Sequence, residues 1–239
     1  DTGMEKDITP QNLSAEIFAV LKNRITHWEY LPNHRFTEIG LCEEFGVSRS
    51  PIREVLQMLE EKGLVVKIPR LGYTVRQPNL EEINELYEFR LAIETYIIER
   101  LTEQRLEHPF LKDLTEQWQA FMTHIPAVDE DAATHDEHFH ETLARALGNS
   151  ILLKQVKEVN ERLHFIRVND ITSPQRWLLT CRQHLDILDT IHKGDVETAR
   201  KSIKTNILEG RQNVDEAVKD ALSGAYLNVK TKAQGIDHI

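Results

Sequence analysis

The segment 46–56, which reads Gly-Val-Ser-Arg-Ser-Pro-Ile-Arg-Glu-Val-Leu, constrains the fold more than any other part of this chain. Within it, Ser48 can cap the start of a helix, and Pro51 is tolerated in the first helical turn. Apolar residues then follow at helical spacing and form one stripe: Ile52, Val55, Leu56 and Leu59. The segment therefore predicts a tight turn followed directly by an amphipathic helix.

Two arginines lie beside this apolar stripe. Arg49 and Arg53 are one helical turn apart, and Gln57 continues the same row. A short helix that is apolar on one side and carries such a row at its N-terminal end is typical of the recognition helix that a helix-turn-helix places in the DNA major groove. The alternative is a solvated surface helix with two ordinary arginines, and the segment alone leaves both interpretations open.

The flanking segments favour the helix-turn-helix. Apolar residues at helical spacing predict a first helix over 13–25, and Thr37 can cap a second, short helix. Gly63 can end the recognition helix. Beyond it, two β-branched runs at 64–68 and 73–76 predict a hairpin. Three helices and a hairpin in this order predict a winged helix-turn-helix.

The hairpin carries basic residues that would let it act as a wing. Its tip at 69–72 holds Arg70 and Gly72, which would reach the minor groove or the DNA backbone. Residues 45–77 hold six basic and three acidic side chains, whereas residues 78–239 hold 19 basic and 28 acidic ones, so the net charge of −10 belongs mainly to the second part. At the start of the recognition helix, we predict contacts with the bases or their flanking phosphates from Ser48, Arg49, Ser50 and Arg53. We predict contacts mainly with the DNA backbone from Arg35, Arg70 and Gly72.

Two copies of the chain are expected to act together on DNA. A single winged head with so modest a basic patch makes too few contacts for tight and specific binding. We therefore predict a homodimer whose two heads bind an inverted-repeat, double-stranded operator.

Many residues of the first third of the chain form a known pattern: Leu31-Pro32, Arg35-Phe36, Glu38, Leu41, Gly46-Val47-Ser48-Arg49, Pro51-Ile52-Arg53-Glu54, Leu56, Leu59, Gly63-Leu64 and Gly72-Tyr73. With them the chain resembles the GntR family of bacterial transcription regulators, and the remainder resembles the FCD effector domain of the FadR subgroup. The resemblance implies a ligand-responsive regulator and no enzyme. It implies no operator sequence, because Ile39 stands where the FadR-like pattern can have a base-contacting arginine.

The rest of the chain has helical periods and no strand signal. A linker is expected at 77–80, because Pro78 blocks continuation of the hairpin and Asn79 can cap the next helix. The predicted fold class is mainly α, with a winged helix-turn-helix at 10–76 followed by an antiparallel bundle of six or seven helices at 81–222. The predicted helical segments are 80–106, 109–124, 129–147, 150–169, 174–193 and 195–222.

The two ends of the chain carry weaker signals. Asp1-Thr2-Gly3 before Met4 is expected to be an expression remnant within a mobile segment 1–9, and the polar residues 223–239 are expected to form a flexible tail. No stretch approaches about 18 consecutive apolar residues, and no signal peptide opens the chain. We therefore expect a cytoplasmic protein with no membrane partner.

Ionisable residues on the apolar stripes of the predicted bundle indicate a buried site. Asp136 and His140 lie on one such stripe, and His184 lies within another. A charged group that faces a bundle core is unfavourable unless it is paired or coordinated, so several of them together predict a site. The other polar residues on the stripes are Arg90, Glu94 and, at an edge, Asn206.

The resemblance gives these residues a role. Asp136, His140 and His184 match the FCD pattern in which an aspartate and histidines hold a divalent metal, and the family's last histidine falls at Asn206. Mixed imidazole and oxygen ligands suit zinc, nickel or manganese. By the same similarity the effector is a small organic acid, and Arg90 is its carboxylate partner, because a buried guanidinium needs a planar anion.

Other interpretations stay open at this point. The aspartate and the histidines could form a hydrogen-bonded core network, and Arg90 and Glu94 could pair only with each other. The bundle could also dimerise the DNA-binding part without sensing anything. A ferritin-like oxidase would use the Glu-x-x-His motifs at 137–140 and 161–164, but Glu161 is predicted to face away from the core, so the two motifs are not expected to converge.

Overall fold

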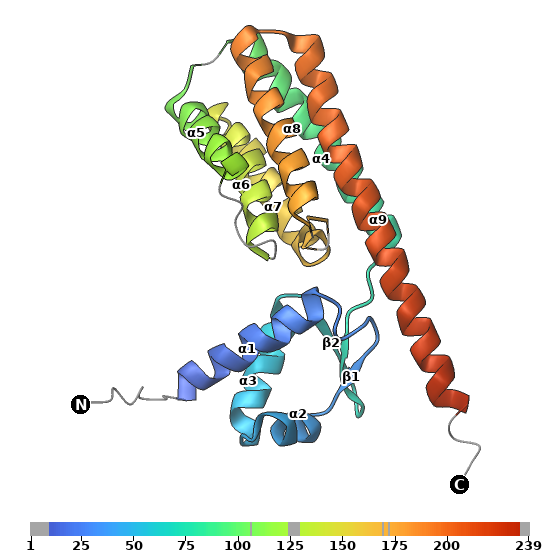
Figure 1. The fold of residues 1–239 in the computed structure, drawn as a ribbon. Coiled ribbons are helices and arrows are strands. Elements are labelled where there is room, and N and C mark those ends of the chain that lie inside the picture. The colour runs from blue at the N-terminus through green and yellow to red at the C-terminus, as the bar shows by residue number, and fades with distance from the viewer. Residues whose placement is uncertain (1–9, 106, 124–129, 169, 172, 235–239) are drawn as a thin grey trace. The chain divides into compact units, whose positions relative to one another are not determined.

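The computed structural model describes residues 10–234, with gaps at residues 106, 124–129, 169 and 172 (Figure 1). The chain divides into two compact units. The first unit comprises residues 1–78 and 219–239, and the second comprises residues 79–218. The expected mobile segment 1–9 lies outside the described residues.

The first unit contains a helix-turn-helix. Its helices are α1 Pro10–Thr26, α2 Glu38–Phe45 and α3 Arg49–Glu61. Oγ1 of Thr37 caps α2 by accepting a hydrogen bond from the backbone N–H of Gly40 at 3.1 Å. Gly46 ends α2 in the left-handed region, with φ of 65°, which turns the chain before α3 begins. Because α3 packs against both α1 and α2, its apolar stripe is buried and its opposite side is exposed.

A small antiparallel sheet completes this unit. The strands β2 Val65–Ile68 and β3 Gly72–Val75 form the predicted hairpin, and β1 Arg35–Phe36 pairs with the other edge of β3. Sequence patterns do not predict β1, since two residues are too few to show an alternation. The order β1-β3-β2 confirms the winged helix-turn-helix and adds one strand to it.

Gly72 allows β1 and β3 to approach each other. Its φ is +95°, a conformation that residues with a side chain rarely adopt. A Cβ atom at this position would lie only 2.4 Å from the backbone oxygen of Phe36. Glycine is therefore required here for backbone packing, whatever contact the wing makes with DNA.

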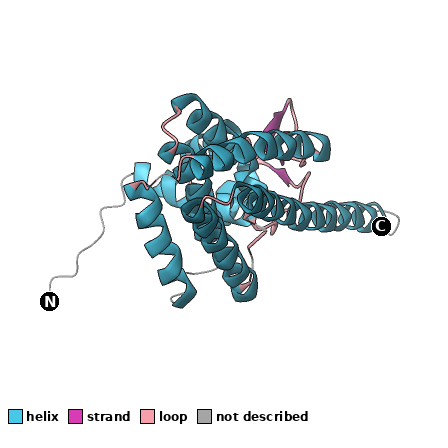
Figure 2. Cartoon of the chain, turned by 90° about the horizontal axis from the view of Figure 1, so that it is seen from above, coloured by secondary structure: helices cyan, strands magenta, loops and turns pink. Residues whose placement is uncertain are grey.

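The second unit is helical throughout its described part, and the described strands all belong to the first unit. Figure 2 distinguishes the few strands, in magenta, from the helices, in cyan. Asn79 caps the first helix of this unit by accepting hydrogen bonds from two backbone N–H groups, as predicted. Helix α4 packs against α6, α7 and α8, so it lies at the centre of the bundle. The helices are α4 Leu80–Glu103, α5 Pro109–Thr123, α6 Glu130–Ala146, α7 Ser150–Arg167, α8 Pro174–Lys193 and α9 Val196–Gln234. The predicted mainly α fold class is confirmed.

Helix α9 is longer than the sequence pattern indicates. It was expected to end at 222, with a flexible tail from 223, but it continues to Gln234. That part of the prediction is wrong, because a single Gly224 costs a helix only about 1 kcal/mol. Residues 235–239 lie outside the described residues. Helix α9 includes residues of both units.

In the described ranges, no helix is both long and apolar enough to cross a membrane.

We predict that Gly72→Ala loosens the wing. Forcing a side chain into this conformation costs on the order of 1–3 kcal/mol. Hydrogen exchange should therefore accelerate at the amide of Val75, which donates to the carbonyl of His34 at 2.9 Å. Gly46→Ala is the control, because Gly46 also has positive φ but nothing lies within 4 Å of its Cβ position. Equal exchange rates at Val75 in the two variants would contradict the steric role of Gly72.

Candidate functional site

The exposed face of α3 begins with a polar row. The apolar stripe of this helix is fully buried, whereas Arg49, Ser50 and Arg53 are exposed at its start. Ser48 occupies the N-cap position as predicted, but its side chain makes no capping hydrogen bond. The hydroxyl of Ser48 is therefore free of the helix backbone, and the first turn of α3 presents polar groups to solvent.

Arg53 is held loosely. Its Nε lies 2.9 Å from Oε2 of Glu38, and its side chain is 62% exposed. Exposed ion pairs of this kind contribute at most about 1 kcal/mol and are screened by salt. The pair can therefore open when another anion, such as a DNA phosphate group, approaches the guanidinium.

The wing places further basic groups at the surface. Arg70 adopts φ of 65° in the turn between β2 and β3, and its side chain is exposed. Arg35 is exposed on β1, which lies next to the hairpin. Gly72 is half-buried beside Phe36. The two arginines are therefore placed where they could contact the DNA backbone. The clearest role of Gly72 is in the packing of the sheet.

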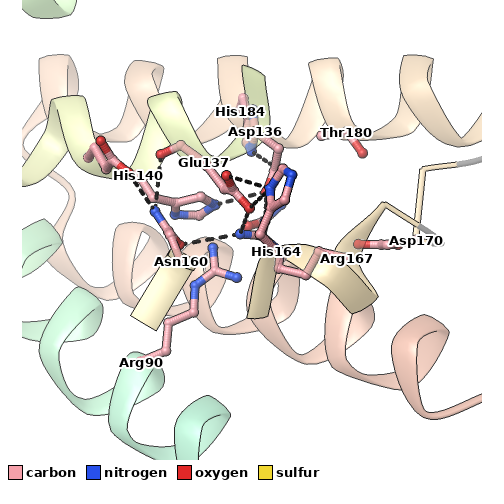
Figure 3. Close-up of polar contacts among 12 residues, drawn as sticks. Arg90, Asp136, Glu137, His140, Asn160, His164, Arg167, Asp170, Thr180 and His184 are labelled. Carbon is pink, nitrogen blue, oxygen red and sulfur yellow. Dashed lines mark hydrogen bonds and ion pairs between the residues drawn. The ribbon is translucent and has the colours of Figure 1, made fainter. Parts of the chain in front are cut away.

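The interior of the bundle brings together three of the predicted metal ligands. Asp136 and His140 on α6 meet His184 on α8, and all three are buried (Figure 3). One ligand atom from each of them lies within 4.8 Å of the others. The helical stripes therefore converge as the sequence pattern indicates.

The spacing of these atoms fits a single ion. Nε2 of His184 lies 3.2 Å from Oδ1 of Asp136, and Nε2 of His140 lies 3.8 Å from Oδ2. Atoms bound to one ion at about 2.0–2.2 Å lie roughly 3–3.5 Å from each other. Small movements would therefore place all three side chains around one divalent ion.

The second ring nitrogen of His140 faces a carboxylate. Its Nδ1 contacts Oε2 of Glu94, and Oε1 of Glu94 accepts a hydrogen bond from Nε of Arg90 at 2.5 Å. Burial opposes ionisation of Glu94, but Arg90 and then His140 lower its pKa to about 2. A charged carboxylate behind a histidine is the usual way to direct the other ring nitrogen toward a metal.

His184 is held by aromatic rings instead. Its ring stacks on Phe139 with centroids 3.7 Å apart, and it meets the ring of Trp118 edge-on at 4.2 Å. Burial lowers the pKa of His184 well below its usual value, so the imidazole is neutral. Among the described residues, Nε2 of His140 and both ring nitrogens of His184 lack a partner with hydrogen-bond geometry. Buried, neutral and unsatisfied imidazoles are suited to metal ligation.

Sequence reasoning missed a second buried arginine. Arg167, the last residue of α7, is only 3% exposed, and its Nη2 contacts Oδ2 of Asp136. Burial and the nearby charge of Arg90 lower the pKa of Arg167 to about 10. The signal was present, because Arg167 follows Leu163 by four residues and therefore lies on the same buried stripe of the helix.

The two Glu-x-x-His motifs meet in part. Nδ1 of His164 lies 3.0 Å from Oε1 of Glu137, so one residue of each motif meets the other, a contact that the sequence did not predict. Glu137 and His164 come into contact because their helices, α6 and α7, pack side by side. Glu161 is exposed, as predicted, and it takes no part in the buried group. A site with two metals would need both glutamates, and this geometry does not supply them.

Asn206 lies close to α8 but is tied to another side chain. It is buried on α9, and its Nδ2 donates to Oε1 of Gln183 at 3.1 Å. Gln183 precedes His184 along α8. As the fourth ligand, Asn206 stays a prediction.

Comparison with protein families covers both units. Residues 13–75 match the bacterial regulatory proteins of the gntR family, and residues 85–208 match the FCD domain.

Curated relatives and a solved structure extend these matches. The gluconate operon transcriptional repressor of Bacillus subtilis (strain 168) is 35% identical over 207 residues, which cover 84% of this chain and 82% of the repressor. YdhC, an uncharacterized HTH-type transcriptional regulator of the same strain, is 28% identical over 191 residues, or 79% of this chain and 84% of YdhC. A structure of Lar, described as controlling expression of the Listeria monocytogenes agr system, has a TM-score of 0.63 at 22% identity, over 89% of this chain and 99% of Lar. At that identity the likeness shows the fold alone.

Proposed function

Because the chain belongs to the GntR family of bacterial regulators and carries an FCD domain, we propose that it is a transcription factor whose hold on DNA is controlled by a small organic acid. The observation that carries this proposal is the polar row at the start of α3. The row stands exposed on a helix whose other side is fixed by packing, which is the arrangement of a recognition helix.

In this proposal the first turn of α3 enters the major groove. Ser48, Arg49, Ser50 and Arg53 would contact base edges or the adjoining phosphates. Arg53 would exchange its weak contact with Glu38 for the DNA. The contacts expected with the DNA backbone come from Arg35, Arg70 and Gly72.

The proposal includes a homodimer on an inverted repeat. One winged head offers only a short recognition helix and a few basic side chains, and these contacts alone would bind weakly at physiological salt. Two heads that bind together add their contacts, and their twofold relation sets the spacing of the operator halves.

The effector site in this proposal is the buried group in the bundle. Asp136, His140 and His184 would hold one divalent ion, zinc, nickel or manganese, with Asn206 as a fourth ligand. When bound, the ion would act as a positive centre that orients the carboxylate of the acid. The support is the fit of the three donors and the unsatisfied imidazole nitrogens.

Arg90 would be the second anchor for the acid. It is buried on α4 and extends toward the group of polar residues in Figure 3. Glu94, whose Oε1 accepts a hydrogen bond from Nε of Arg90 at 2.5 Å, would hold the arginine in place until the acid binds. The name of the gluconate operon repressor supports an acid of this kind, since gluconate is a carboxylate.

The DNA-binding part of the proposal predicts that Arg49→Ala weakens operator binding and relaxes base preference. The expected loss is on the order of 1–3 kcal/mol of discrimination. The measurement is a titration of the variant and the wild type against an operator selected from random DNA. Lys62→Ala is the control, because Lys62 is an exposed basic residue just beyond the other end of α3. If Arg49→Ala binds the operator as tightly as Lys62→Ala does, α3 is not the recognition helix.

The metal part of the proposal predicts that His140→Ala and His184→Ala abolish stoichiometric metal binding. Each variant removes one of the two imidazole ligands, which leaves too few strong donors to retain an ion through gel filtration. Elemental analysis of protein loaded with zinc measures the outcome. His138→Ala is the control, since His138 is exposed on α6 two residues before His140. Retention of one zinc ion by both interior variants would show that the residues form a core network and no metal site.

The effector part of the proposal predicts that Arg90→Met still binds the operator but no longer releases it when acid is added. Methionine has a similar size and no charge, so the carboxylate would lose its partner. The measurement is operator release by gluconate and by a series of smaller carboxylates. Arg100→Met is the control on the same helix, because the Arg100 side chain is 43% exposed and its Nη1 lies 2.6 Å from Oε2 of Glu103. If the Arg90→Met variant releases the operator at the same acid concentration as the wild type, Arg90 has a purely structural role.

A further inference from the structure

Arg167 has no role in the function proposed above, although it is among the most buried charged groups of the bundle. Its side chain is 4% exposed. It reaches from the end of α7 to Asp136 on α6, which is one of the three proposed metal ligands (Figure 3). A guanidinium in this position must affect how the carboxylate binds an ion.

Both terminal nitrogens of the Arg167 guanidinium, Nη1 and Nη2, have partners. Nη2 contacts Oδ2 of Asp136, while Nη1 donates to Oδ1 of Asn160 at 3.3 Å and lies 3.6 Å from Oε1 of Glu137. Glu137 is in turn held by His164 at 3.0 Å. Arg167 is therefore oriented by its surroundings and presents one N–H group to one oxygen of Asp136.

The contact between Arg167 and Asp136 gives the two carboxylate oxygens of Asp136 different neighbours. Oδ2 is engaged by Arg167 and also lies 3.8 Å from Nε2 of His140, whereas Oδ1 lies 3.2 Å from Nε2 of His184. A carboxylate can bind an arginine through one oxygen and an ion through the other, because each oxygen has its own lone pairs.

We infer that Arg167 is a positioning residue for the metal site: it fixes the rotation of Asp136 so that Oδ1 faces the ion. The inference rests on the proposed metal site and adds to it a residue that touches no metal. Arg167 would then do for Asp136 what Glu94 does for His140, where a charged group on a neighbouring helix directs the ligand atom.

The opposite role would be that of a competitor, which an arriving ion displaces from Asp136. Displacement would cost the buried guanidinium its closest carboxylate and leave only the more distant Glu137, which is unfavourable. The contacts to Asn160 and Glu137 also hold Arg167 in place independently of Asp136. The geometry therefore favours an ion that binds while Arg167 stays on Oδ2. The two roles predict opposite changes in metal affinity when Arg167 is replaced.

The test is a zinc titration of the full chain against a chromophoric chelator, with Arg167→Met and Arg167→Lys. Loss of a group that orients a metal ligand weakens metal binding by about 10–100-fold. We therefore expect the zinc affinity of Arg167→Met to be lower than that of the wild type by about this factor. Arg167→Lys should lie between it and the wild type, because lysine keeps the charge but not the fork. Arg162→Met on the same helix is the control, since Arg162 is 57% exposed and pairs only with Glu82 among the described residues. It should bind zinc as the wild type does.

A second variant covers the case in which Arg167→Met does not fold. Asn160→Ala removes the anchor of Nη1 and leaves the Arg167 charge in place, so it should weaken zinc binding in the same direction but by less. Circular dichroism and operator binding of the metal-free variants check that the fold is intact. Zinc affinity equal to or higher than that of the wild type in Arg167→Lys and Asn160→Ala would overturn the inference. A wild type that binds no zinc would instead overturn the proposed metal site on which the inference rests.

Discussion

The bundle depends on how it accommodates buried charge. Arg90, Glu94, Asp136 and Arg167 are each at most 5% exposed, and any one of them alone would strongly destabilise the fold. They are tolerated because each arginine lies against a carboxylate, Arg90 against Glu94 and Arg167 against Asp136. The two histidines between these pairs keep ring nitrogens that have no hydrogen-bond partner among the described residues. An interior that is balanced in charge but incompletely bonded has the properties of a binding site.

A second group of hydrogen bonds, centred on Asp170, connects the helices that surround the site. Asp170 follows Arg167 closely, and its backbone N–H donates to the carbonyl of Arg167 at 2.9 Å. Oδ1 of Asp170 accepts hydrogen bonds from Arg176 on α8 at 3.1 Å and from Asn213 on α9 at 2.7 Å. The ends of α7 and α8 are thus tied to α9, the helix that includes residues of both units. We expect a change at Arg167 to act on this hydrogen-bonded group.

Most of the fold could be predicted from periodicity, because long helices show it over many turns. The bounds of the helices were close except at α9, which continues beyond Gly224 to Gln234 because one glycine costs a helix only about 1 kcal/mol. Strand β1 was missed because two residues carry no pattern, and it forms only where β3 offers an edge. At the site, Asp136, His140 and His184 could be placed from their stripes. The partners of these residues could not, since contacts such as that between His164 and Glu137 depend on how two helices face each other. Sequence spacing within one helix does not determine that orientation.

The central claim is that the interior of the bundle holds one divalent ion between α6 and α8. Anomalous X-ray diffraction at the zinc edge, from crystals of the full chain grown with zinc, tests it directly. The account predicts one interior peak about 2.0–2.2 Å from Oδ1 of Asp136 and from Nε2 of His140 and His184. A zinc-loaded crystal whose peaks all lie at surface residues, with the imidazoles bonded to protein groups, would contradict it.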